Sequence, residues 1–240
     1  MGELSKSQID KLGDRLRSGP QTEEDLRLLD EFRSSYSQSF GIVRQILHLR
    51  GVEPVARNIK STLSIVAKLR RQPIKLSRIQ DIAGCRIVVD EVWDQQRELW
   101  NLKFAFPDAD IKDRRTQPSH GYRAVHLIVQ ANGKPFEIQV RTLLQHRWAE
   151  LSEKASDIVD PEIKYGGLGR GFRVPLIALS QQIASYEVEQ LAMYGPCESA
   201  EYGTITKALS DEREDRLARL FATIGMRVRD LTAILESIRP

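Results

Sequence analysis

The chain has 240 residues, of which 41% are hydrophobic and 29% charged, and its formal net charge is +3. This is the composition of a globular protein, and no stretch approaches the roughly 20 apolar residues of a membrane-spanning helix. The small positive charge permits a phosphate-rich partner but does not require one. Because the first residues also lack an apolar signal core, we expect a cytoplasmic protein that makes no membrane contact.

The N-terminal part of the chain predicts helices. Thr22 is followed by three acidic residues, which is typical of a helix start, and apolar residues then recur with helical spacing. We therefore expect one helix over about 23–50. A second helix is predicted over about 55–69, and Pro73 prevents it from continuing.

The middle of the chain predicts a small sheet, and the rest predicts helices. Short β-branched or alternating runs favour strands over 85–89, 109–112, 122–130 and 136–141. Helical spacing predicts helices over 92–104, 142–157, 174–191 and 211–238. The expected fold class is α+β, with a small mixed β-sheet core flanked by N-terminal and C-terminal helices. The expected domains are an N-terminal helical segment, a core and a C-terminal helical extension, over 1–50, 51–160 and 161–240.

Basic side chains recur with helical spacing in the second predicted helix. Lys60, Ser64 and Lys68 are four residues apart, so on a helix they share one face. Two ammonium groups and a hydroxyl on one face suit a polyphosphate ligand. The alternative is a solvated basic face without a ligand.

A carboxylate precedes the first predicted strand. Asp81 lies just before that strand, and Arg86 lies within it. A carboxylate at a sheet edge is a natural ligand for Mg²⁺, which prefers a few carboxylates together with phosphate oxygens. The alternative is an aspartate that caps a loop.

Polar residues alternate with apolar ones along the last two predicted strands. Glu137, Gln139 and Arg141 would point to one face of their strand, with the apolar residues between them in the core. If the two strands pair as a hairpin, Tyr122 and His126 can share that face. The alternative is a half-exposed strand with a polar outer face.

Four stretches together resemble the synthetase domain of the RelA/SpoT family, the pyrophosphokinases that make (p)ppGpp. They are KSTLSIVAK, RIQDIAGCRIV, GYRAVHLIV and EIQVRT, in the family's order, and they lie within about residues 57–157. The combination is far more specific than any single stretch. The resemblance implies a nucleotidyltransferase-like core that transfers the β,γ-pyrophosphate of ATP to the 3′-hydroxyl of GDP or GTP, with Mg²⁺ as cofactor.

The resemblance also implies a role for each matching position. The residues implied to bind ATP are Arg57, Lys60, Ser64, Lys68 and Arg86. Those implied to bind the acceptor are Lys112, Arg115, Tyr122 and His126, and those implied to bind Mg²⁺ are Asp81 and Glu137. Glu137, Gln139 and Arg141 are implied to be catalytic, with Glu137 also a candidate to activate the attacking hydroxyl.

One position departs from the family pattern. Asn58 stands two residues before Lys60, where the family has an arginine that stacks on adenine. Arg57 is one residue further back, so it could replace that arginine only after a small shift. No stretch resembles the family's HD hydrolase domain or its long regulatory C-terminus, which implies a small protein with the synthetase alone.

The acceptor is the open question. Some small members of the family are toxins that pyrophosphorylate the 3′ CCA end of tRNA with the same catalytic residues, and an adenosine nucleotide is a third candidate. A non-catalytic nucleic-acid-binding module is a different class, but it would have no need of separated carboxylates beside phosphate-binding lysines. The C-terminal helices could form a homo-oligomer or bind an antitoxin.

Overall fold

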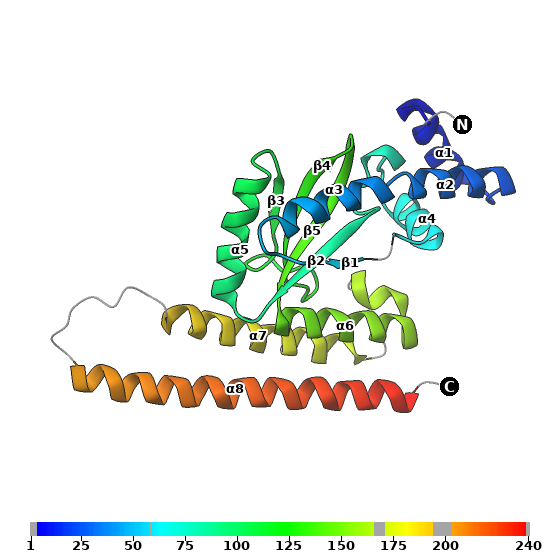
Figure 1. Cartoon of the computed structure of the whole chain (residues 1–240). Coiled ribbons are helices and arrows are strands. Elements are labelled where there is room, and N and C mark those ends of the chain that lie inside the picture. Colours follow the sequence, from blue (N-terminus) through cyan, green and yellow to red (C-terminus); the bar gives the residue numbers. More distant parts are fainter. Residues whose placement is uncertain (1–3, 58, 166–170, 194–202, 239–240) are drawn as a thin grey trace. The chain divides into compact units, whose positions relative to one another are not determined.

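A computed structural model describes residues 4–57, 59–165, 171–193 and 203–238 (Figure 1). Helices precede and follow a five-stranded mixed sheet with the strand order β1-β2-β5-β4-β3. Strand β1 (Val55–Ala56) runs antiparallel to β2 (Gly84–Val89). The other strands are β3 (Asp110–Asp113), β4 (Val125–Ala131) and β5 (Lys134–Thr142). The predicted class, a small mixed sheet flanked by helices, is confirmed.

The chain begins with a helix that the apolar pattern does not predict. Helix α1 (Lys6–Ser18) is capped by Ser5, whose side chain accepts from the backbone N–H of Gln8, while the Gln8 side chain accepts from the backbone N–H of Ser5. This capping box is a sequence signal that the prediction misses. Thr22 and Asp25 form a second capping box at the next helix start, as expected.

The expected single helix over 23–50 is wrong. Helix α2 (Glu23–Ser34) ends before Ser35, and helix α3 (Ser37–His48) begins after Tyr36. Tyr36 is only 1% exposed, and its ring packs edge-on against Phe32 with the centroids 5.4 Å apart. Burial of this ring turns the chain at a point where helical spacing alone predicts that the helix continues.

The helix expected over 55–69 begins later than predicted. The first of these residues form β1, and the backbone N–H groups of Arg57 and Lys60 donate to carbonyl oxygens before and within β2. Ser61 then caps helix α4 (Thr62–Arg71), which is followed by the short 3₁₀ helix η1 (Leu76–Arg78). Lys60 therefore lies on an extended segment and not on the helix.

Strand β4 begins at Val125, so its expected start at Tyr122 is wrong. His120 and Gly121 have φ angles of 53° and 91°, which lie in the left-handed region that a strand does not contain. At the far end of β4, Asn132-Gly133 has φ angles of 53° and 70° and forms the two-residue turn of a tight hairpin to β5.

The chain divides into two compact units. The first comprises residues 1–87, 102–112 and 126–139, and the second comprises 88–101, 113–125 and 140–240. In the first unit, α1 packs against α2, α4 and η1. The expected domains at 1–50, 51–160 and 161–240 stay a prediction.

The second unit is built mainly from helices. Helix α6 (Leu143–Ile158), η2 (Pro161–Tyr165), α7 (Arg173–Met193) and α8 (Gly203–Ile238) follow β5, and α6, α7 and α8 pack on one another (Figure 1). Trp148, Leu176 and Ile183 are among the buried residues of this core. Helix α5 (Val92–Ala105) lies between β2 and β3 in the chain. Within the described residues, no helix is long and apolar enough to cross a membrane.

Gly13 in α1 and Gly41 in α3 form a matched pair for testing helix packing. A Cβ at residue 13 would lie 2.7 Å from the Cβ of Leu76, whereas a Cβ at residue 41 would meet nothing within 4 Å. We expect Gly13→Ala to lower the free energy of unfolding by about 1–3 kcal/mol through overpacking. Gly41→Ala should raise it by up to about 1 kcal/mol through helix propensity. Urea unfolding measures both, and equal effects would contradict the packing of α1 against η1.

Candidate functional site

Asp81 holds two lysines within the first unit. Lys60 Nζ lies 2.9 Å from its Oδ2, and Lys68 Nζ lies 2.7 Å from its Oδ1. Burial alone would raise the pKa of Asp81, but the charges of the two ammonium groups outweigh burial and lower this pKa to about 2. Asp81 is therefore a fixed negative charge between two cations.

The predicted basic helix face is wrong in its geometry. Only Ser64 and Lys68 lie on α4, because Lys60 precedes the cap of that helix. The hydroxyl of Ser64 is exposed and is hydrogen-bonded to that of Ser61, 2.9 Å away. Lys60 and Lys68 still lie close together, because both contact Asp81 and not because they share a helix face.

Glu137 on β5 is a buried carboxylate of the first unit. His126 Nδ1 on β4 lies 2.8 Å from its Oε1, and the Gln139 side-chain amide donates to its Oε2 over 2.7 Å. The guanidinium of Arg57 also donates to Oε2. Burial would raise the pKa of Glu137, but the hydrogen bond and charge of His126 and the charge of Arg57 lower it to about 2. The expectation that His126 and Glu137 share a face of the hairpin is confirmed.

A glycine lets β2 lie close to Glu137. A Cβ at residue 84 would lie 2.5 Å from the backbone oxygen of Glu137 and 3.3 Å from Arg57 Nη1. Gly84 is therefore needed for close backbone approach, and a glycine directly before a predicted strand is the signal that could have identified it. Arg86 lies two residues further along β2, opposite Val55 of β1.

The two carboxylates suit a magnesium ion. The charge of Asp81 acts to raise the pKa of Glu137, so the two groups are close enough to interact. Both remain ionised at neutral pH, and ionised carboxylate oxygens are ligands that Mg²⁺ prefers. No cluster of three or more His, Cys, Asp or Glu side chains in the described part of the chain could hold a metal ion. Mg²⁺ here would thus need further oxygens, which the phosphates of a substrate can supply.

Tyr122 and Arg141 form a pair within the second unit. Arg141 Nη2 donates to the Tyr122 hydroxyl over 2.9 Å, and its guanidinium carbon lies 5.0 Å from the centre of the Tyr122 ring. The ring also lies beside Trp148 of α6, with the centroids 6.5 Å apart. A Cβ at residue 121 would lie 2.8 Å from Trp148, so Gly121 allows the loop to approach α6 closely. Although Tyr122 is not on a strand, it meets Arg141 as expected.

Lys112 and Arg115, which the sequence implies as acceptor-binding residues, both have acidic neighbours. Lys112 Nζ donates to the side-chain oxygen of Gln80 and lies 3.7 Å from Asp110 Oδ2. Arg115 forms an ion pair with Asp113, with Nη2 and Oδ2 2.6 Å apart. These partners are not residues of the predicted site.

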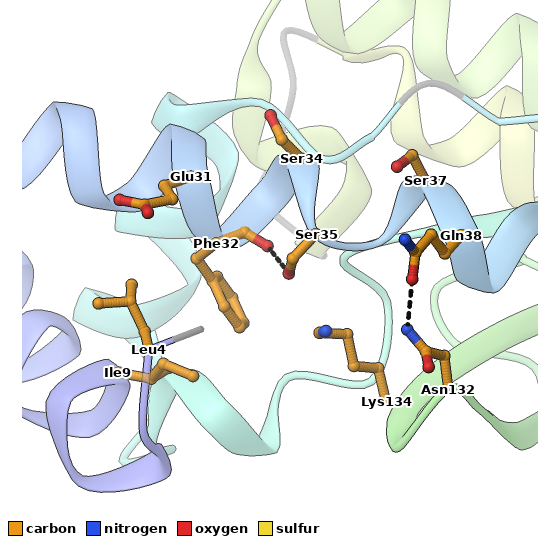
Figure 2. Close-up of a pocket in the computed structure, with 10 residues that line it drawn as sticks. All are labelled: Leu4, Ile9, Glu31, Phe32, Ser34, Ser35, Ser37, Gln38, Asn132 and Lys134. Carbon is orange, nitrogen blue, oxygen red and sulfur yellow. Dashed lines mark hydrogen bonds between the residues drawn. The ribbon is translucent and has the colours of Figure 1, made fainter. Parts of the chain in front are cut away.

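A pocket of about 350 Å³ lies elsewhere in the first unit. Figure 2 shows it between the start of α1, the junction of α2 and α3 and the β4–β5 turn, with Phe32 and Lys134 among its walls. The Asn132 side chain donates to that of Gln38 over 3.0 Å at its edge. None of the predicted site residues lines this pocket.

The pKa values of Asp81 and Glu137 predict how stability depends on pH. Because both folded-state pKa values lie below the ordinary ones of 3.8 and 4.5, each carboxylate stabilises the fold above about pH 4.5. This contribution, on the order of 2 kcal/mol for each group, should be lost as the pH falls from about 4.5 to about 2.

Urea unfolding at about pH 6 and about pH 3 tests this prediction. Asp81→Asn and Glu137→Gln should each flatten the pH dependence, and Glu150→Gln on the exposed face of α6 should leave it as in the wild type. The same pH dependence in all four proteins would contradict the low pKa values.

Part of the chain is similar to known proteins. A family model described as a region found in RelA/SpoT proteins matches residues 57–157. An uncharacterized protein of Mycobacterium tuberculosis is 39% identical over 115 residues, which are 46% of this chain and 42% of that protein. A probable chloroplastic GTP diphosphokinase of Arabidopsis thaliana is 34% identical over 96 residues, 38% of this chain and 14% of that protein. The chain thus spans less than half the length of these curated relatives.

The fold also resembles solved structures. A crystal structure of the small alarmone synthetase 1 from Bacillus subtilis is 25% identical, covers 72% of this chain and 97% of its own, and gives a TM-score of 0.52. The same enzyme bound to its product pppGpp is 24% identical, covers 70% of this chain and 99% of its own, and gives the same TM-score. The sequence motifs and the family model agree that residues 57–157 of this chain match the region found in RelA/SpoT proteins.

Proposed function

We propose that the chain is a pyrophosphokinase that transfers the β,γ-pyrophosphate of ATP to the 3′-hydroxyl of GDP or GTP. The observation that carries this proposal is the pairing of two ionised carboxylates, Asp81 and Glu137, with basic side chains inside the RelA/SpoT region. The relatives named as GTP diphosphokinase and small alarmone synthetase support the same activity. The acceptor 3′-oxygen gives up its proton to solvent and bonds to the β-phosphorus of ATP, the bond from that phosphorus to the α–β bridging oxygen breaks, and AMP leaves with that oxygen.

Lys60 and Lys68 would hold the phosphates of ATP. Each ammonium has three N–H donors, so each lysine can keep its bond to Asp81 and also donate to a phosphate oxygen. Fixed cations stabilise the charge that spreads over the transferring phosphates in the transition state. Ser64, at the start of α4, would add a hydroxyl donor.

Arg86 and Arg57 would contact the adenine. Arg86 lies on β2, and a planar guanidinium can stack on a base. Arg57 is bound to Glu137 in this structure, so stacking on adenine would require it to exchange that partner for the nucleotide. In this proposed role, ATP binding would break the contact between Arg57 and Glu137.

Asp81 and Glu137 would bind Mg²⁺ together with phosphate oxygens. The ion, when bound, supplies positive charge to the transferring phosphates. A pKa of about 2 keeps Glu137 ionised for this purpose. The same low pKa makes Glu137 a weak proton acceptor while Arg57 and His126 remain bound to it, because a general base works best with a pKa near the working pH.

The acceptor would be held by residues from several loops and strands. Tyr122 offers an aromatic ring on which a guanine base can stack, and Arg141 fixes the orientation of that ring. His126, Lys112 and Arg115 would contact acceptor phosphates or ribose, and Gln139 would orient Glu137 through the hydrogen bond between them. Homo-oligomer formation or antitoxin binding through the C-terminal helices, and a cytoplasmic location, stay predictions.

A transfer assay with γ-labelled ATP and Mg²⁺ tests the proposal directly. Separate reactions contain GDP, GTP, ATP alone or deacylated tRNA. We expect label on GDP or GTP, and we expect Glu137→Gln to lower its rate by about 100-fold or more, because the variant loses a charge beside the transferring phosphates. Glu150→Gln, an exposed glutamate on α6, is the matched control and should keep the wild-type rate.

Each other outcome has a definite meaning. Label on tRNA alone would replace GDP and GTP by the 3′ end of tRNA as acceptor. Label formed with ATP alone would indicate an adenosine nucleotide. No label on any acceptor, with tRNA binding that Glu137→Gln leaves intact, would contradict the enzyme proposal and favour a nucleic-acid-binding module.

A further inference from the structure

The loop that carries Tyr122 is held by helix α7. The hydroxyl of Ser180 on α7 donates to the backbone oxygen of Gly121 over 2.6 Å and accepts from Arg123 Nε over 3.2 Å. Gly121 and Arg123 are the two chain neighbours of Tyr122. Ser180 is 2% exposed, so water does not compete for these bonds.

The strand that carries Arg141 is held by the same helix. Thr142 follows Arg141 at the end of β5, and its hydroxyl donates to Glu187 Oε1 on α7 over 2.7 Å. The Gln145 side-chain amide donates to both carboxylate oxygens of Glu187 over 2.9 and 3.1 Å. Glu187 is 6% exposed.

Further hydrogen bonds fix the first turn of α6. The Thr142 side chain caps this helix by accepting from the backbone N–H of Gln145, and the Gln145 side chain accepts from Thr142 in return. Gln95 of α5 donates to the Gln145 side chain and to the backbone oxygen of Val140, both over 2.8 Å. The residues on both sides of Arg141 are therefore in one buried network that ends on Glu187.

Ser180 and Glu187 lie on one face of one helix. They are seven residues apart, which is about two turns or roughly 10 Å along α7. Ser180 holds the loop that carries Tyr122, and Glu187 holds the end of the strand that carries Arg141. Helix α7 thus holds both Tyr122 and Arg141 in place, and the Arg141 Nη2 atom lies 2.9 Å from the Tyr122 hydroxyl.

We propose that Ser180 and Glu187 are positioning residues for the acceptor, acting through Tyr122 and Arg141. Both lie outside residues 57–157, so the C-terminal extension contributes to a site that the matched region does not complete by itself. The inference rests on the proposed function for its link to the acceptor. The hold of α7 on the loop is a separate claim that can be measured without any reaction.

The test compares matched variants along α7. Ser180→Ala removes the two loop contacts, whereas Ser185→Ala removes only a hydroxyl bonded to the backbone oxygen of Gln181 within the helix. Glu187→Ala removes the strand contact, and Glu187→Gln keeps an oxygen that can accept from Thr142. Glu189→Gln is the matched acidic control, because Glu189 pairs with Arg216 of α8.

Hydrogen exchange and kinetics are then measured on the same full-length proteins. We expect Ser180→Ala to speed exchange of the backbone amides of residues 119–123 by about 5- to 10-fold, which corresponds to the loss of about one buried hydrogen bond. KM for GDP should rise by a similar factor, and KM for ATP should stay within about twofold. Tyr122→Ala gives the reference for full loss of the acceptor platform. Glu187→Ala should raise KM for GDP more than Glu187→Gln, and both controls should match the wild type.

The outcomes separate this inference from the proposed function. Unchanged exchange in Ser180→Ala would overturn the inference, and so would equal rises in KM for ATP and GDP. If the wild type transfers label to neither GDP nor GTP, the proposed function fails. Faster exchange of residues 119–123 in Ser180→Ala, but not in Ser185→Ala, would still support the hold of α7 on the loop.

Discussion

Two ionised carboxylates, the partly buried Asp81 and the buried Glu137, determine which cations gather in the first unit. An isolated buried charge is costly, so Asp81 and Glu137 are tolerated only because cations and hydrogen-bond donors surround them. The extended segment before α4 brings Lys60 to Asp81, and the β4–β5 hairpin brings His126 to Glu137. The extended segment and the hairpin therefore both bring a basic side chain to a carboxylate that has to be neutralised.

The same arrangement explains how the site could exchange partners. The cations that neutralise the carboxylates are the groups that a polyphosphate would recruit, because ammonium and guanidinium groups bind phosphate oxygens well. A phosphate that draws Arg57 toward itself leaves a carboxylate oxygen of Glu137 available for a metal ion. Binding of nucleotide and of metal would then favour each other. The nucleotide draws a cation away from a carboxylate, and the metal ion neutralises the negative charge that this exposes.

The sequence predicts the sheet and much of the site, for a physical reason. Alternation along a strand is a local property, so Glu137 and Gln139 could be assigned to one face, and pairing across the hairpin with His126 followed from it. The capped helix start at Thr22 was equally local, because its signal lies in four consecutive residues.

The features that the sequence does not predict depend on contacts between distant residues. Burial of Tyr36 breaks a helix that its own spacing favours, and a backbone hydrogen bond to Ile82, just before β2, keeps Lys60 off α4. Gly121, which is left-handed, lies close to Trp148, and Ser180 bonds to the same loop from a helix position 59 residues further along the chain. No local sequence pattern predicts these contacts, because each one depends on a partner residue that is distant in the sequence.

The central claim is that Asp81 and Glu137 couple metal binding to nucleotide binding. Calorimetric titration with a non-hydrolysable ATP analogue, with and without Mg²⁺, tests it most directly. The account predicts that Mg²⁺ raises the affinity of the wild type by about tenfold or more, and that Asp81→Asn loses most of this gain. A gain of equal size in the wild type and in Asp81→Asn would contradict it.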